Sequence, residues 1–154
     1  MHKFDELDMR ILSELTRDAS ISVPRLSKKL NVNASVLYSR IKRLSKRSLV
    51  KKFTVIVNEN MLGINVKATV GITRDPKLKE PIQNELLKIP EVRSVSEVTG
   101  RFDMIVTVNA HSLEELHGVV IERIGKIDGI QNTETFVEMQ RIEKEPIYNI
   151  QNTR

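Results

Sequence analysis

The stretch SVPRLSKKLNVNASVLYSRIKRL, residues 22–44, decides how the first third of this chain folds. Apolar residues recur at helical spacing on either side of a short break, which predicts one helix over 23–30 and a second over 34–47. The buried stripe of the second helix is predicted to be Leu37, Ile41 and Leu44. Two short helices joined by a turn of about three residues have the helix-turn-helix layout.

Residues that favour helix ends occupy the break and its flanks. Ser22 is a good N-cap for the first helix, and Pro24 is tolerated in its first turn. Asn31 can adopt a positive φ at low cost, and Asn33 can cap the second helix. The turn chemistry therefore agrees with the spacing of the apolar residues.

Two further elements extend this unit. Apolar residues at helical spacing predict a helix over 5–17, which Asp5 and Asp8 can begin with a capping box. A run rich in β-branched residues predicts a linking strand over 49–57. Three helices followed by this strand predict a winged helix-turn-helix domain.

The outward side of the second predicted helix is polar and basic. In the major groove it would present four side chains to base edges: Ser35, Tyr38, Ser39 and Lys42. Cations on its flanks and just beyond it are assigned to phosphates: Arg40, Arg43, Lys46, Arg47, Lys51 and Lys52. Asn33, at the start of the helix, joins this DNA-binding set. The alternative is that these residues have no role in DNA binding. Any three-helix bundle has helices with one apolar and one polar stripe, and Tyr38 could simply pack against its neighbours.

Charge is divided unevenly along the 154 residues. Residues 1–52 hold 13 Lys and Arg against 5 Asp and Glu, a net charge of +8, whereas residues 53–154 hold 12 against 15, a net charge of −3. A basic first third on a mildly acidic remainder is typical of a protein whose one segment meets a polyanion. This asymmetry favours double-stranded DNA as a partner over a merely solvated basic face.

The remaining residues alternate between strand and helix patterns. Strands are predicted over 66–72, 92–98, 104–110 and 131–142, and helices over 77–88 and 112–124. The valines of the second strand are three residues apart, so a bulge is expected there. This order predicts an α+β ferredoxin-like βαββαβ sheet with both helices on one face. Because apolar side chains occur on both phases, we expect a second copy to cover the other face in a homodimer.

Composition and spacing argue against other classes of protein. The absence of cysteine removes disulfides, thiolate catalysis and Cys-based zinc sites. No signal peptide or membrane-length apolar run is present, so we expect a cytoplasmic protein with no membrane partner. His111 and His117 lack the i, i+4 spacing of a helical metal site. With no catalytic constellation or phosphate-binding loop, and too few aromatics for an RNA-binding sheet, we expect a non-enzyme without metal or cofactor.

The order of elements over roughly residues 5–142 resembles that of the Lrp/AsnC regulators, the feast/famine family. The motifs that carry the resemblance are Leu7-Asp8 with Ile11-Leu12, Arg40-Ile41-Lys42-Arg43-Leu44, Leu62-Gly63, Val98-Thr99-Gly100 with Asp103, and Gly129-Ile130 with Thr133 and Thr135. The resemblance implies a transcription factor that dimerises through ferredoxin-like (RAM) domains, often forms tetramers or octamers, and commonly senses an amino acid. The expected parts are a DNA-binding domain, a linking strand and hinge, a RAM domain and a tail, at residues 1–52, 53–63, 64–142 and 143–154.

The resemblance also implies an effector site near the loop between the second and third strands. Carried over to this sequence, the site residues are Thr99, Gly100, Arg101, Asp103, Thr133 and Thr135. Asp103 can accept from an α-ammonium group, and threonine hydroxyls can serve a carboxylate. The alternative is that Gly100 only supplies a positive φ and that Asp103 caps the turn. Arg101 stands where the family often has an acidic residue; it could pair with a carboxylate, but we expect solvated surface.

Departures from the family pattern concern the DNA-binding domain. Ser48 replaces a frequent glycine, which costs about 1 kcal/mol if the left-handed conformation is kept. Arg25 and Ser45 replace frequent acidic residues, so strong non-specific DNA affinity is expected. The predicted function is a sequence-specific transcriptional regulator modulated by an amino acid or related molecule. The alternatives are a weakly specific architectural DNA-binding protein and a metabolite sensor that acts through protein contacts.

Overall fold

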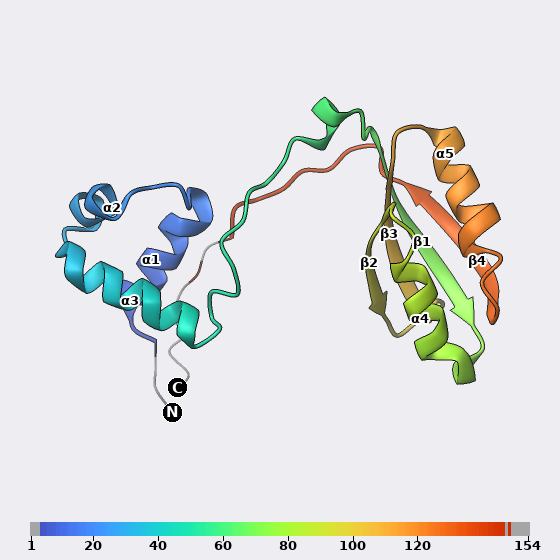
Figure 1. The fold of residues 1–154 in the computed structure, drawn as a ribbon, viewed down its shortest axis with the longest axis horizontal. Coiled ribbons are helices and arrows are strands. Elements are labelled where there is room, and N and C mark those ends of the chain that lie inside the picture. The colour runs from blue at the N-terminus through green and yellow to red at the C-terminus, as the bar shows by residue number, and fades with distance from the viewer. Residues whose placement is uncertain (1–3, 147, 149–154) are drawn as a thin grey trace. The chain divides into compact units, whose positions relative to one another are not determined.

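The computed structural model describes residues 4–146 and 148. The described residues form two compact units, one holding those up to Ile56 together with the described residues from Ile142 onward, and the other holding Val57–Arg141. The first contains the three N-terminal helices and the second a sheet with helices packed on it (Figure 1). Each unit has its own buried apolar cluster and is described by itself.

The first unit is a helix-turn-helix domain. Its helices are α1 (Glu6–Arg17), α2 (Val23–Leu30) and α3 (Ala34–Lys46), within about one residue of the predicted bounds. Its core is formed by one apolar stripe from each helix: Ile11, Leu26, Leu30, Leu37 and Leu44. The predicted buried face of α3 is confirmed, with Ile41 partly buried beside this core.

Most of the predicted helix caps are confirmed. The Asp5 carboxylate accepts from the Asp8 N–H while Asp8 accepts from the Asp5 N–H, a reciprocal capping box. The Asn33 side chain accepts from the Ser35 N–H, and Asn31 adopts a φ of 53°. Ser22 occupies the N-cap position of α2, but its side chain makes no capping hydrogen bond.

Helix α3 ends in a Schellman motif built on serine instead of glycine. The Leu49 N–H donates to the Leu44 carbonyl (3.1 Å), and the Ser48 N–H donates to the Ser45 carbonyl (2.9 Å). Ser48 is held at a φ of 58°, so the left-handed conformation is kept despite its Cβ.

Ser48→Gly is expected to raise the free energy of unfolding of the first unit by about 1 kcal/mol, because glycine reaches this conformation without a Cβ penalty. For a unit of this size the gain corresponds to about 4–8 °C in the unfolding temperature, measurable by calorimetry. Ser45→Gly, in the last turn of the same helix, is the control and should destabilise by about 0.5 kcal/mol. Changes of the same sign in the free energy of unfolding of the two variants would contradict the explanation that Ser48 is strained by its left-handed conformation.

The predicted linking strand over 49–57 is wrong. Residues 51–58 have no regular secondary structure, and no described strand pairs with them. Val55 and Ile56 leave 80% and 98% of their surface exposed. Residues with high β-propensity make a strand only where a neighbouring chain accepts their backbone hydrogen bonds, and within one described chain none does. The wing of the predicted winged domain is therefore not formed.

The second unit has the predicted ferredoxin-like order. Its elements are β1 (Val66–Arg74), α4 (Lys79–Leu87), β2 (Val92–Glu97), β3 (Met104–Ala110), α5 (Leu113–Gly118), a π-helical turn (Val119–Ile124) and β4 (Ile130–Val137). Short 3₁₀ turns, Glu59–Leu62 and Pro76–Leu78, precede β1 and α4. The strands form one antiparallel sheet in the order β2-β3-β1-β4. The last strand ends at Val137, five residues earlier than the predicted 131–142, with one further hydrogen bond to β1 from the Glu138 N–H to the Lys67 carbonyl (2.8 Å).

Both helices of this unit pack on one face of the sheet (Figure 1). Alternate residues of the central strands β1 and β3 form the core beneath them: Ala68, Val70, Ile72, Met104, Val106, Val108 and Ala110. The expected bulge in β2 is confirmed, because its register against β3 shifts between Val92 and Ser94. The described helices do not cover the other face, which we call the open face.

Candidate nucleic-acid interface and effector loop

Helix α3 separates its side chains by chemistry. The residues predicted to reach base edges, Ser35, Tyr38, Ser39 and Lys42, are all exposed, and so are Asn33, Lys46, Arg47, Lys51 and Lys52. Tyr38 leaves 63% of its surface exposed, so it does not pack into the core. A convex, polar and cationic helix face is the form that enters a major groove.

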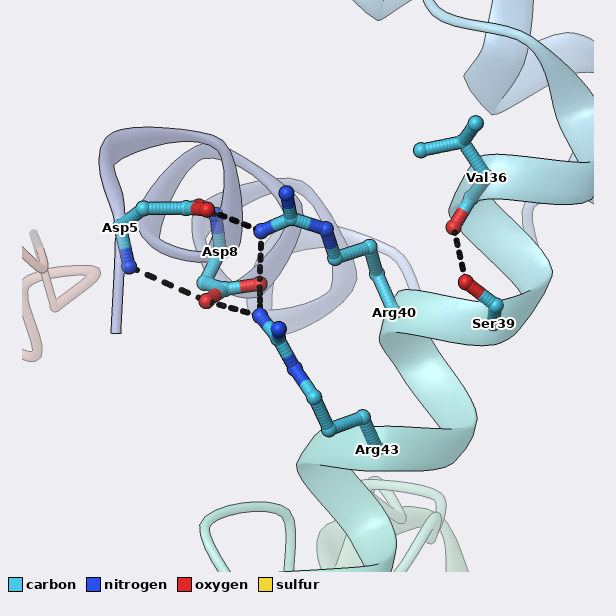
Figure 2. Close-up of polar contacts among 6 residues, drawn as sticks. All are labelled: Asp5, Asp8, Val36, Ser39, Arg40 and Arg43. Atoms are coloured by element: carbon cyan, nitrogen blue, oxygen red, sulfur yellow. Dashed lines mark hydrogen bonds and ion pairs between the residues drawn. The ribbon is translucent and has the colours of Figure 1, made fainter. Parts of the chain in front are cut away.

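Two of the residues predicted to contact base edges already make hydrogen bonds within the chain. The Ser39 hydroxyl donates to the Val36 carbonyl (3.1 Å; Figure 2), and the Ser35 hydroxyl donates to the Asn33 side-chain oxygen (2.8 Å). Each hydroxyl oxygen keeps lone pairs that can accept from a base amino group. The Asn33 oxygen is occupied by the helix cap, so this residue chiefly positions the start of α3.

Arg40 and Arg43 differ from the other cations of α3. Both guanidinium groups point toward the start of α1 (Figure 2). Arg43 Nη2 donates to both oxygens of Asp8 at 2.8 and 2.6 Å, and Arg40 Nη1 bridges Asp8 and Asp5. Asp8 is completely buried. Each of these two arginines, predicted to hold a phosphate, therefore has a carboxylate partner within the described chain.

This cluster has clear electrostatic consequences. The hydrogen bond from Arg40 lowers the pKa of the Asp5 carboxyl below its ordinary value, and the same bond raises the pKa of Arg40. Arg43 Nε is buried and has no hydrogen-bond partner among the described residues. Sequence analysis missed the role of Asp8, because the packing of α1 against α3 cannot be read from either helix alone.

The loop between β2 and β3 is held by backbone hydrogen bonds. The Asp103 carboxylate accepts from the Arg74 N–H at 2.9 Å, and the Asp103 N–H donates to the Ile72 carbonyl. Gly100 has a φ of 130°, and no atom lies within 4 Å of the position where a Cβ would stand. Gly100 is thus required by its backbone conformation and not by a close contact within this chain.

Arg101 folds over the open face of the sheet. Its guanidinium lies 4.8 Å from the centre of the Phe102 ring and makes an ion pair with Glu134 of β4. Of the two alternatives considered for Arg101, the structure shows the ion pair with a carboxylate, on a side chain that remains 71% exposed at the surface. Phe102 covers Gly71 and meets Phe136 edge-on at 6.3 Å. These contacts fix the loop on the open face.

The structure does not bring Thr133 and Thr135 together with this loop. In the β1–β4 register they lie opposite Ile72 and Val70, which face the helices. Glu134, the residue between them, lies opposite Gly71 on the open face. Alternation along β4 therefore separates the two threonines from the side chains that Arg101 contacts.

Sequence analysis also missed two polar clusters of this unit. Glu59 accepts from Asn109 (2.8 Å) and pairs with Lys67 (3.2 Å) and Arg93 (3.5 Å), which ties the 3₁₀ turn before β1 to three strands. Arg74 is buried and pairs with Glu97, whose pKa is lowered chiefly by its hydrogen bond to Lys79. Only the sheet order brings these residues together, so local sequence gave no signal.

Comparison with known families identifies the chain. Residues 4–45 match the AsnC-type helix-turn-helix domain, and residues 67–148, more than half of the chain, match the Lrp/AsnC ligand binding domain. The chain belongs to the Lrp/AsnC family. The predicted helix-turn-helix domain, the ferredoxin-like domain and the predicted role of a transcriptional regulator are thereby confirmed.

Relatives of this Lrp/AsnC regulator match it over most of their length. Regulatory protein AsnC of Haemophilus influenzae is 33% identical over 141 residues, covering 91% of this chain and 94% of the relative. HTH-type transcriptional regulator FL11 of Pyrococcus furiosus is 32% identical over 136 residues, covering 88% and 89%.

Solved structures share the fold of this Lrp/AsnC chain. Escherichia coli AsnC superposes with a TM-score of 0.87 at 26% identity, covering 95% of this chain and 99% of that one. A Neisseria meningitidis transcriptional regulator, solved as a complex with L-methionine, has a TM-score of 0.89 at 17% identity and covers 96% and 97%. Among the described residues, none of the helices is long and apolar enough to span a membrane.

Proposed function

We propose that this Lrp/AsnC regulator reads specific DNA sequences with the exposed face of α3 and that an amino acid bound near the β2–β3 loop changes its affinity for DNA. The observation that carries the DNA half is the division of α3 into a buried apolar stripe and an exposed polar and basic face. The net charge of +8 over residues 1–52 supports the same assignment. DNA binding of this kind needs no metal, cofactor or catalytic step, and it takes place in the cytoplasm.

Lys42→Ala and Ser39→Ala are expected to lower discrimination between an operator and unrelated DNA by about 1–3 kcal/mol, because these side chains are placed to reach base edges. Lys51→Ala, beyond the helix, should instead weaken binding to all sequences by a similar factor. Competition titrations of each variant against specific and unrelated duplexes measure the two effects separately. An equal loss on every sequence in all three variants would contradict this division of roles.

The open face of the sheet supports a homodimer. Phe136 leaves 47% of its surface exposed there, beside the Phe102 ring, and Ile105 of β3 lies on the same face, opposite Gly71 of β1. A second copy would cover these side chains and bring two copies of α3 to a near-palindromic site. Tetramers or octamers are a further step that we expect from the family. Sedimentation at several concentrations tests this assembly.

The effector half rests on the loop that carries Thr99, Gly100, Arg101 and Asp103. Open space beside Gly100 leaves room for a small ligand to approach the backbone. Structurally similar regulators from Neisseria meningitidis and Mycobacterium tuberculosis were solved with L-methionine, which supports an amino acid as the ligand class. Thr133 and Thr135 face the helices, and the proposal leaves them out. Saturating amino acids that change neither assembly size nor operator affinity would refute this half alone.

A further inference from the structure

The start of α1 and the middle of α3 share four charged groups. Arg43 gives one nitrogen to both oxygens of the buried Asp8, and Arg40 bridges Asp8 and Asp5 (Figure 2). The Arg40 side chain is 24% exposed and that of Asp5 is 49% exposed, so this end of the cluster reaches the surface. Residues 40–47, which end at the C-cap of α3, contain five cations, and the two carboxylates neutralise two of them.

We propose that Asp5 and Asp8 are positioning residues for DNA recognition: they keep Arg40 and Arg43 on α1 in the DNA complex, so that neither arginine neutralises a phosphate. The proposal rests on α3 being the DNA-reading helix. It leaves the electrostatic contacts to the exposed cations Lys46, Arg47, Lys51 and Lys52.

The burial of Asp8 strongly favours keeping its ion pair with Arg43. Moving Arg43 to a phosphate would leave a completely buried carboxylate with fewer partners, which costs more than an exposed ionic contact returns. Arg40 is held by two carboxylates at once, so its move would break two contacts to form one. Asp5 is also fixed by the capping box, and its carboxylate cannot follow Arg40 toward DNA.

The position of the cluster also explains how it affects sequence discrimination. Arg40 and Arg43 flank Lys42 in the sequence, and Arg40 directly follows Ser39; Lys42 and Ser39 are the side chains proposed to reach base edges. Tying both arginines to α1 fixes the rotation of α3 about its own axis. It also limits sequence-independent attraction to phosphate, which would otherwise raise affinity for every site alike.

The salt dependence of DNA binding tests this arrangement. Each lost phosphate contact reduces the slope of log K against log salt by about 0.9, so Lys46→Gln should reduce it by about 1.8 per dimer. Arg40→Gln removes the same charge from the same helix, yet we expect it to change the slope by less than about 0.3. Both variants are measured below their unfolding temperatures on one unrelated and one operator duplex.

Asp5→Asn provides an independent second arm. Asparagine keeps the N-cap hydrogen bond but removes one of the two carboxylate charges that hold Arg40. With Asp8 as its only carboxylate partner, Arg40 should be able to reach a phosphate, which would steepen the slope by about 0.9 per recognition helix and lower the ratio of specific to non-specific affinity. Glu6→Gln is the matched control, because it removes the same charge from the exposed neighbouring residue, which has no contact with Arg40 in the described structure.

The outcomes separate the two proposals. A slope lowered by Arg40→Gln as much as by Lys46→Gln would overturn the inference, because Arg40 would then be a phosphate contact. Equal slopes for Asp5→Asn and Glu6→Gln would overturn it as well. Failure of the wild-type protein to bind any duplex would instead refute the proposed DNA-binding function of α3.

Discussion

Replacing Asp8 by alanine is expected to lower the free energy of unfolding of the DNA-binding unit by about 3–5 kcal/mol, because it breaks a buried ion pair from one side. Asp8 is 0% exposed and accepts from Arg43, Arg40 and the Asp5 N–H. Without its carboxylate, Arg43 keeps a partly buried charge whose Nε already has no partner among the described residues. The variant also loses half of the capping box.

Denaturant unfolding followed by circular dichroism measures this loss. Glu6→Ala is the control, since an exposed residue in the same turn of α1 should change the free energy by no more than about 0.5 kcal/mol. Similar losses for the two variants would show that the cluster adds nothing beyond surface charge. Because the loss falls on a small domain, Asp8→Ala is expected to abolish DNA binding at 37 °C through unfolding.

Gly71→Ala has the largest expected effect in the second unit. A Cβ at Gly71 would stand 2.6 Å from two ring atoms of Phe102, so the ring has to move. Moving the ring disturbs its edge-on contact with Phe136 and its cation–π contact with the Arg101 guanidinium. Overpacking of this kind typically costs about 1–3 kcal/mol, and here it also displaces the loop proposed to bind the effector.

A double-mutant cycle isolates this contact. In a Phe102→Ala background the ring is gone, so Gly71→Ala should cost less than about 0.5 kcal/mol. Gly118→Ala is the control, because nothing lies within 4 Å of the added methyl group and the residue is helical. It should stabilise by up to about 1 kcal/mol. A cost for Gly71→Ala that persists without the Phe102 ring would contradict the steric explanation.

The parts of the fold that depend on neighbouring residues could be predicted from the sequence. The capping box of Asp5 and Asp8, the left-handed Asn31 and the cap at Asn33 all follow from side chains acting within about one helical turn. The alternation of β1 and β3 likewise follows from a period of two. Ser48 kept the left-handed conformation because the Schellman hydrogen bonds at the end of α3 require it.

The parts that depend on distant residues could not be predicted. The Asp8–Arg43 pair joins residues 35 positions apart and needs the crossing of α1 and α3. Thr133 and Thr135 were grouped with the β2–β3 loop, but only the β1–β4 register shows which face they occupy. The linking segment was assigned as a strand from its composition, whereas pairing depends on a neighbour that the described chain does not supply.

The most direct test of the central claim is a gel-shift titration against genomic fragments, including the DNA upstream of the protein's own gene, with competitor DNA and with or without the twenty amino acids. The account predicts that the protein selects particular fragments over the competitor and that the amino acids change the midpoint of the titration. Selective binding whose midpoint does not change with the amino acids would support a DNA-binding regulator and contradict the proposed amino-acid effector. Equal binding to every fragment, or none, would contradict sequence-specific regulation by α3.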